Sequence, residues 1–150
     1  TVDYALANSC DVIVFEYLDT KGRKKGSKKQ KLSMWKHQDI QKTTERLAHS
    51  LGIRVAHVCA WNTSKLAYDG SGVVLRGKKV SEDTPYDVCK FQSGKTYNCD
   101  LSASYNIGAR YIIKELIKVL PNIMTEVSNI GGGTSRTLST LWNINSVMVI

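Results

Sequence analysis

The stretch CDVIVFEYLD, residues 10–19, decides how the rest of the chain is interpreted. Its β-branched and aromatic residues predict a strand, in which alternate side chains share a face. Glu16 follows Val12 and Val14 on one face, so a carboxylate interrupts a row of apolar side chains. Because burying an unpaired carboxylate is costly, Glu16 faces water at a strand edge, pairs with a cation, or is kept for chemistry. The strand alone leaves these alternatives open.

The length and composition of the chain indicate one domain with a hydrophobic core. The chain has 150 residues, of which 42% are hydrophobic and 23% charged. It contains no apolar run long enough to span a bilayer and no signal-like N-terminus, so we expect a cytoplasmic protein without a membrane partner. Its four cysteines, Cys10, Cys59, Cys89 and Cys99, include no C-x-x-C pair. We therefore expect reduced, buried thiols.

Basic side chains concentrate in KGRKKGSKKQK, residues 21–31. The chain carries a net charge of +8, and this segment holds seven of its 21 Lys and Arg residues and no acid, which leaves 14 bases against 13 acids. Its glycines predict a flexible loop, and a polyphosphate backbone is the anion that such a loop suits. A merely solubilising loop or a localisation tag is the alternative. The candidate nucleic-acid-binding residues are Lys21, Arg23, Lys24, Lys25, Lys28, Lys29 and Lys31.

The segment after the basic loop predicts a helix followed by a second strand. Ser33 is a candidate N-cap, and Gly52 is a candidate C-terminal stop. IRVAHVCAW, residues 53–61, then returns to a strand pattern. Strand, helix and strand at this spacing predict a parallel βαβ unit over residues 1–61. The apolar stripe of the helix is expected at Ile40, Thr44, Leu47 and Leu51.

The second half of the chain begins with a glycine-rich segment and continues into a long helix. Residues 62–98 predict a hairpin-rich insertion without clear core periodicity, and residues 99–120 predict a helix that Pro121 ends. Asp100 falls in the first turn of that helix, where the dipole alone favours an acid. Residues 121–150 are assigned no role. The expected buried stripe of the helix is Leu101, Tyr105, Gly108, Ile112, Leu116 and Val119.

The order of these pieces resembles the C-terminal half of a RuvC-like nuclease domain. The resemblance rests on VIVFEYLD, the basic loop, MWKHQDIQKTTERLAHSLGI, the strand leading into NTSK, the hairpin insertion and CDLSASYNIGAR, and it covers residues 1–118. The families concerned are the OrfB/TnpB transposon-associated nucleases and the type V CRISPR effectors. The implied α/β fold is a partial ribonuclease H-like (RuvC-like) fold: a βαβ unit, a hairpin-rich insertion and a C-terminal helix.

The resemblance implies an RNA-guided DNA endonuclease that uses Mg²⁺ or Mn²⁺. It places Glu16 on the second acidic segment and Asp100 on the third, with Asn106 as a supporting residue at the end of DLSASYNI. Carboxylates that meet at one end of the sheet would bind two metal ions about 4 Å apart for phosphodiester cleavage. The implied partners are DNA and a guide RNA.

The sequence also departs from the pattern of these families. No acid before Glu16 fits the first acidic segment, so we expect an N-terminal half of the domain, or a second chain, to complete the sheet. The isolated chain is therefore expected to be inactive. Only Cys89 remains of the zinc-ribbon cysteines, so no zinc is expected, and Cys99 and Ser102 replace the usual Arg and Asn around Asp100.

Two other hypotheses remain beside a cleaving nuclease. One is a degenerate RuvC-like module that binds nucleic acid without cutting it, which the missing first acid and the incomplete zinc ribbon favour. The other is an unrelated α/β domain whose basic loop contacts RNA or an acidic partner, with both carboxylates in structural roles.

Overall fold

The computed structural model describes residues 1–17, 28–120 and 136–148, without the side chains of residues 28–35 and 145–148. The described chain is mixed α/β and divides into two compact units, Thr1–Val58 and Cys59–Ile150. Within the described residues, no helix has both the length and the apolar character needed to cross a membrane.

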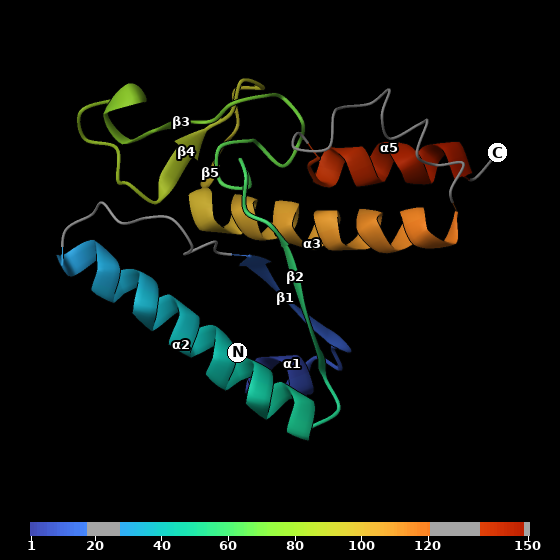
Figure 1. Ribbon diagram of the computed structural model, residues 1–150. Helices are drawn as coiled ribbons and strands as arrows, with labels where there is room; N and C mark the ends of the chain where they lie inside the picture. Colours follow the sequence, from blue (N-terminus) through green and yellow to red (C-terminus); the bar gives the residue numbers. More distant parts are fainter. Residues whose placement is uncertain (18–27, 121–135, 149–150) are drawn as a thin grey trace. The chain divides into compact units, whose positions relative to one another are not determined.

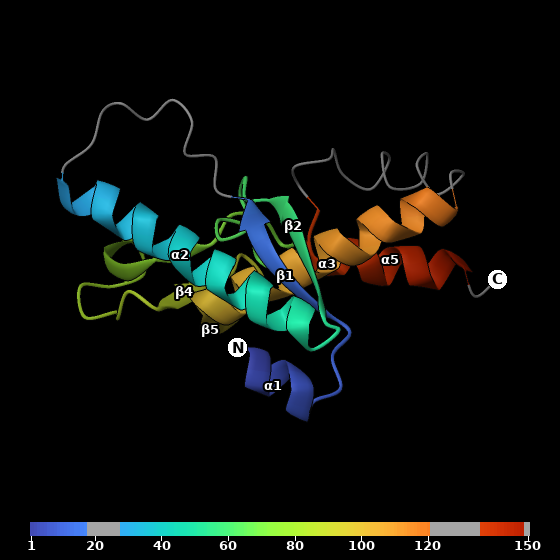
Figure 2. The ribbon, with the colours of Figure 1, turned by 60° about the horizontal axis from the view of Figure 1, so that its bottom comes forward.

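The first unit is a βαβ unit preceded by a short helix. Its strands β1 and β2 are hydrogen-bonded neighbours in a two-stranded sheet, and Figures 1 and 2 show them running in the same direction. The long helix α2 provides the crossover that parallel strands require. The predicted order of strand, helix and strand is confirmed. The elements are α1 (Val2–Ala7), β1 (Val12–Tyr17), α2 (Lys28–Ser50) and β2 (Arg54–Cys59).

The start of α2 differs from the prediction, whereas its end agrees with it. The helix begins at Lys28, so the assignment of Ser33 as N-cap is wrong. Lys and Gln are good helix formers, and the run that precedes Ser33 extends the helix toward the N-terminus. Lys28 and its basic neighbours therefore lie on the first turns of a helix. At the other end, Gly52 adopts a φ of +74°, the left-handed conformation that commonly follows a helix.

The core of the first unit is built largely from small and β-branched side chains. The apolar stripe expected on α2 is largely wrong, because Ile40 is 57% exposed and Leu47 47% exposed. Among residues 36–50 of α2, whose side chains the structure describes, Thr44 and Ala48 are the buried ones instead. The small side chain of Ala48 allows α1 and the sheet to approach the helix closely. The core cluster consists of Val2, Ala5, Ile13, Ala48 and Ile53.

The second unit begins with a small antiparallel sheet, as the hairpin prediction requires. Strand β4 pairs with β3 on one side and β5 on the other, with Cys89 opposite Tyr97. Sequence periodicity indicated no core here, yet one exists because turns and short strands each contribute a residue or two. That core consists of Ala67, Tyr68, Val74, Cys89, Phe91 and Cys99. The elements are β3 (Leu75–Arg76), the 3₁₀ turn η1 (Gly77–Lys79), β4 (Val88–Lys90) and β5 (Thr96–Asn98).

Two helices complete the second unit. Helix α3 (Cys99–Val119) follows β5 directly, and α5 (Leu138–Met148) lies beside it in Figures 1 and 2. Ile113 and Ile144 form the buried contact between the two helices. Part of the tail, to which the sequence assigned no role, therefore covers α3.

The buried face of α3 is not the face that the sequence predicts. Leu101 is 52% exposed, Ile112 45% and Val119 76%, so the expected stripe faces outward over much of its length. The buried face consists mainly of small and polar residues that contact neighbouring loops, and hydrophobicity therefore does not mark it. Its residues are Cys99, Ser102, Ala103, Asn106, Ala109, Arg110 and Ile113.

Candidate functional site

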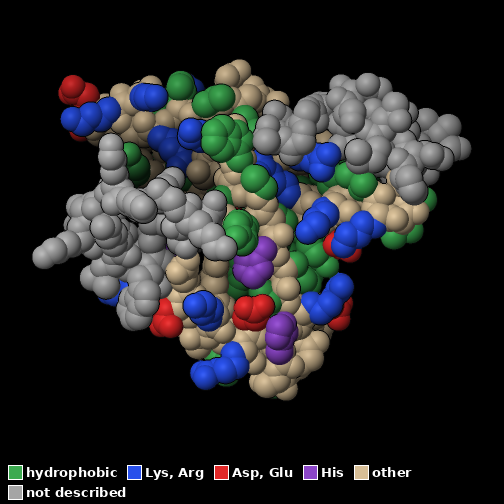
Figure 3. All heavy atoms as spheres, viewed as in Figure 1, with side chains coloured by type: hydrophobic (Ala, Val, Ile, Leu, Met, Phe, Trp, Pro, Cys, Tyr) green, Lys and Arg blue, Asp and Glu red, His purple; other side chains and the backbone are tan. Residues whose placement is uncertain are grey.

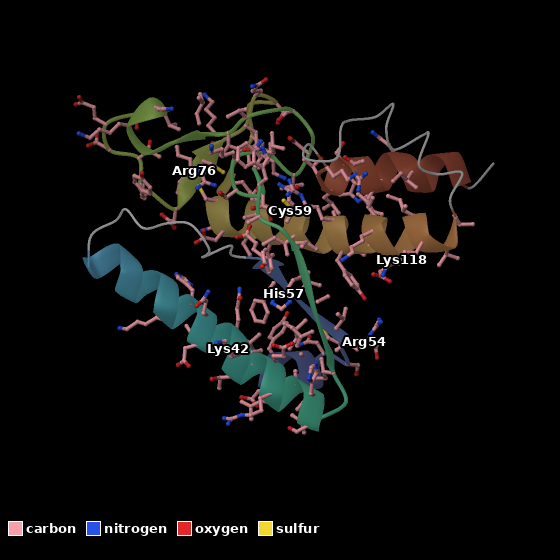
Figure 4. The ribbon with its side chains drawn as sticks, viewed as in Figure 1. Lys42, Arg54, His57, Cys59, Arg76 and Lys118 are labelled. Carbon is pink, nitrogen blue, oxygen red and sulfur yellow. The ribbon has the colours of Figure 1, made fainter. Side chains whose placement is uncertain are left out.

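Glu16 lies near the end of β1 and is half-buried. Its backbone oxygen accepts a hydrogen bond of 3.1 Å from Nε2 of Gln41 on α2, which ties this point of the strand to the crossover helix. The preceding residue, Phe15, packs with its ring centroid 6.2 Å from that of His57 on β2, which Figure 4 labels. The predicted strand position of Glu16 is confirmed.

Asp100 lies in the first turn of α3, and its side chain is exposed. The cap of this helix is Asn98, whose Oδ1 accepts hydrogen bonds from the backbone N–H of Asp100 at 2.9 Å and of Leu101 at 3.1 Å. Asp100 is therefore not needed as the cap. Within the described residues, its carboxylate makes no hydrogen bond and no ion pair, so it remains available to a cation.

The chemistry of the two carboxylates fits a magnesium or manganese ion, because both metals prefer oxygen ligands. Glu16 belongs to the first unit and Asp100 to the second, and the structure describes each unit separately. Across the described residues, no three His, Cys, Asp or Glu side chains come together in a group that could hold a metal ion. Each carboxylate is thus a single candidate ligand.

Asn106 is fully buried on α3 and holds three segments together. Its Nδ2 donates hydrogen bonds to the backbone oxygens of Thr63 at 3.0 Å and Leu66 at 2.9 Å. Its Oδ1 accepts from the backbone N–H of Leu138, at the start of α5, at 3.3 Å. These hydrogen bonds position α3 against the loop before the hairpin sheet. The supporting role that the resemblance implies for Asn106 at the third acidic segment stays a prediction.

Arg110, one turn after Asn106, is a positioning residue that the sequence analysis missed. It is 6% exposed, and its Nη1 donates to the backbone oxygens of Cys59 and Trp61, both at 2.7 Å. Its Nε donates to the oxygen of Arg136 at 3.2 Å. The four-residue spacing between Asn106 and Arg110 was the available signal, because it places both side chains on one helix face.

A tyrosine cluster, defined as Tyr68, Tyr97 and Tyr105 with Lys95, lies where the hairpin sheet meets α3. The ring of Tyr68 packs edge-on against Tyr97 and Tyr105, with centroid separations of 5.2 Å in both cases. The Lys95 ammonium lies 4.9 Å from the centroid of Tyr68 and 4.8 Å from that of Tyr97. The sequence analysis did not find this cluster, because its members come from three separate segments.

Two titratable groups near the hairpin sheet have shifted pKa values. Burial raises the pKa of Cys89 to about 11, and a hydrogen bond with Cys99 adds to the shift, so this thiol stays protonated at neutral pH. Burial alone would raise the pKa of Asp69, but hydrogen bonds from Ser93 and Ser71 outweigh it, and the pKa is lowered. The Asp69 carboxylate therefore links the turn at Ser71 to the turn at Ser93.

The structure places the basic segment only in part. Lys21, Arg23, Lys24 and Lys25 lie outside the described residues. Lys28, Lys29 and Lys31 lie on the first turns of α2, where no acid is present. Figure 3 shows further Lys and Arg side chains on the hairpin sheet and along α3. Among those that Figure 4 labels, Arg76 donates through Nη2 to the backbone oxygen of Ser64.

Comparison with known proteins adds no family to this description, because no protein-family model, curated protein or solved structure matches the chain. The class of protein must therefore be argued from the residues and their placement.

Proposed function

We propose that this chain is the C-terminal part of a metal-dependent, RNA-guided DNA endonuclease of the RuvC-like kind found in TnpB and type V effectors. The observation that carries the proposal is Asp100, an exposed carboxylate without a partner among the described residues, on the helix that follows the hairpin sheet. Its place in the element order is that of the third acidic segment. Glu16 on β1 takes the place of the second.

In this proposal Glu16 and Asp100 hold Mg²⁺ or Mn²⁺, and the bound ions supply an activated water and stabilise the leaving oxygen. The remaining residues position these carboxylates. Gln41 ties the strand at Glu16 to α2, and the Asn98 cap leaves the Asp100 carboxylate unengaged. The cleaved bond is a phosphodiester bond of DNA in the cytoplasm. We assign no zinc to the insertion, because Cys89 lies in an apolar core beside Cys99.

The proposal includes further chain to complete the sheet. The described part of the first unit has two parallel strands, and a pair of strands is marginal unless more strands or helices cover it. We propose that an N-terminal half of the nuclease domain, or a second chain, supplies the missing strands and the first acid. The basic segment of residues 21–31 would then contact DNA or guide RNA.

A degenerate RuvC-like module that binds nucleic acid without cutting it is the second candidate. The tyrosine cluster favours it, because exposed aromatic rings beside a lysine suit binding and need no metal. The two candidates differ only in whether the carboxylates act on the bound strand.

Cleavage by the full-length protein with its guide separates the two candidates. We expect Mg²⁺-dependent cutting of target DNA, and Glu16→Gln or Asp100→Asn should each abolish it, because either change removes a metal ligand. Binding of guide and target should stay within about twofold, since phosphate contacts are unchanged. Asp83→Asn is the matched control, because Asp83 is an exposed acid of the insertion. It should cut like the unmodified protein.

Two outcomes would contradict the nuclease proposal. Full-length protein that binds guide and target but cuts under no divalent cation would favour the degenerate module. Full cutting by both Glu16→Gln and Asp100→Asn would show that neither carboxylate is a metal ligand.

A further inference from the structure

The outer rings of the tyrosine cluster are partly exposed and held in place. Tyr105 is 40% exposed on α3, and Tyr97 is half-buried on β5. Both pack against the buried ring of Tyr68, with interplanar angles of 66° for Tyr97 and 71° for Tyr105. Rings fixed by such edge-on contacts lose little conformational entropy when a flat ligand stacks on them.

The two outer tyrosines also share a contact between their hydroxyl groups. The Tyr97 hydroxyl donates to that of Tyr105 across 3.4 Å, and their ring centroids lie 6.4 Å apart. This hydrogen bond, together with burial and the neighbouring Tyr105 and Tyr68, raises the pKa of Tyr97 to about 12. A tyrosine at its ordinary pKa of about 10 is also neutral at physiological pH, so the shift changes no charge on this surface.

Lys95 brings a positive charge to the same surface. It is exposed, donates to the Tyr68 hydroxyl, and has its ammonium over the rings of Tyr68 and Tyr97. Among the described residues it forms no salt bridge. The nearby Asp69 is engaged by the hydroxyl of Ser93 at 2.7 Å and the N–H of Ser71 at 3.0 Å. The charge of Lys95 also contributes to the lowered pKa of Asp69, so an incoming phosphate would meet both this ammonium and a neighbouring carboxylate.

Leu101 extends the surface along α3. It lies one helical turn before Tyr105 and is 52% exposed. An apolar strip with tyrosine rings and a lysine at its edge has the two features that single-stranded nucleic acid needs, which are faces for stacking and a cation for the backbone.

We propose that Tyr97, Tyr105 and Lys95 form a binding site for unpaired bases of a single-stranded nucleic acid, with a base stacked on Tyr105 and a phosphate beside Lys95. The site rests on the nucleic-acid binding that is part of the proposed function.

Binding of fluorescein-labelled dT₁₂ and rU₁₂ to the 150-residue chain, measured by anisotropy in EDTA, tests the site without any cleavage. Tyr105→Leu should weaken binding about fivefold to 150-fold, the range for loss of one stacked base. Tyr105→Phe keeps the ring and should bind within about twofold of the unmodified chain. Tyr86→Leu is the matched control, because Tyr86 is 86% exposed but lies outside the cluster, and it should bind normally.

Two further experiments test the role of the Lys95 charge and the location of the bound strand. Lys95→Gln should reduce the slope of log K against log salt by about 0.7, the value for one phosphate contact on a single strand. Photocrosslinking with 5-iodouridine oligonucleotides should modify Tyr105 or Tyr97. Comparison of dT₁₂ with rU₁₂ shows whether DNA or RNA occupies the site.

Three results would overturn the site. The first is Tyr105→Leu binding as tightly as Tyr86→Leu, and the second is Tyr105→Phe losing as much affinity as Tyr105→Leu. The third is crosslinking confined to residues outside the cluster, which would place the oligonucleotide elsewhere on the chain. Because the assay contains EDTA, these results are independent of cleavage. An intact binding site on a protein that never cuts would overturn only the nuclease proposal, and circular dichroism of each variant confirms that it is folded.

Discussion

At the residue scale, two buried polar side chains on α3 determine how the second unit is assembled. Asn106 and Arg110 direct their donors at backbone oxygens of the loop before the hairpin sheet. A buried carbonyl without a partner costs free energy, so each of these hydrogen bonds is needed where it occurs. The proposed position of Asp100 depends on them, because they hold the helix that carries it.

Replacement of Asn106 by Ala should therefore be among the most destabilising changes in this unit. It removes the hydrogen bonds to the oxygens of Thr63 and Leu66 and from the N–H of Leu138, at about 1–3 kcal/mol for each group that water does not reach. We expect a loss of about 3 kcal/mol in the free energy of unfolding, measured by urea denaturation. Ser104→Ala, on the exposed face of the same helix, should change it by less than about 0.5 kcal/mol. Equal effects of the two changes would contradict this role.

At the element scale, glycines in a turn and in a helix have opposite roles. Gly70 has a φ of +79°, and a Cβ there would lie 2.7 Å from Oγ of Ser139 on α5. Gly108 lies within α3, and a Cβ there would meet nothing within 4 Å. The first glycine allows the turn to approach α5, whereas the second only weakens its helix.

Gly70→Ala and Gly108→Ala should thus change stability in opposite directions. Gly70→Ala should lower the free energy of unfolding by about 1–2 kcal/mol, because alanine disfavours the left-handed conformation. Gly108→Ala should raise it by about 0.5–1 kcal/mol through higher helix propensity. Urea denaturation of both variants measures the two shifts. A stable Gly70→Ala variant would show that the turn can relax away from Ser139.

At the scale of the whole molecule, both units carry basic side chains that could contact a nucleic acid. The basic segment accounts for seven of the 21 basic residues, and further lysines lie on the hairpin sheet and on α3. If residues 21–31 hold phosphates, as proposed, they determine the salt dependence of nucleic-acid affinity more than lysines elsewhere do.

Replacing Lys24, Lys25, Lys28 and Lys29 by Gln should weaken duplex binding and flatten its salt dependence. Each lost phosphate contact removes roughly 0.9 from the slope of log K against log salt, so the slope should fall by up to about 3.6. Replacing Lys65, Lys78, Lys79 and Lys114, which are all exposed, by Gln changes the charge equally. This control should alter the slope less, and an equal change would assign binding to overall charge.

Local sequence patterns predicted most of the elements and the local placement of both carboxylates. The strand around Glu16, the stop at Gly52, the hairpins of residues 62–98 and the first-turn position of Asp100 all follow from neighbouring residues. Turn chemistry and strand propensity act over a few residues, so one segment carries enough information for them.

The buried face of α3 and the tyrosine cluster were decided only by the tertiary structure. Leu101 and Ile112 are apolar but exposed, whereas Asn106 and Arg110 are polar but buried, because the loop against which they pack offers carbonyl groups. Tyr68, Tyr97 and Tyr105 meet although up to 37 positions separate them in the chain. The sequence by itself therefore determined the elements and the candidate acids. The tertiary structure determined which faces are buried, since burial depends on which distant segments supply hydrogen-bond partners and packing surfaces.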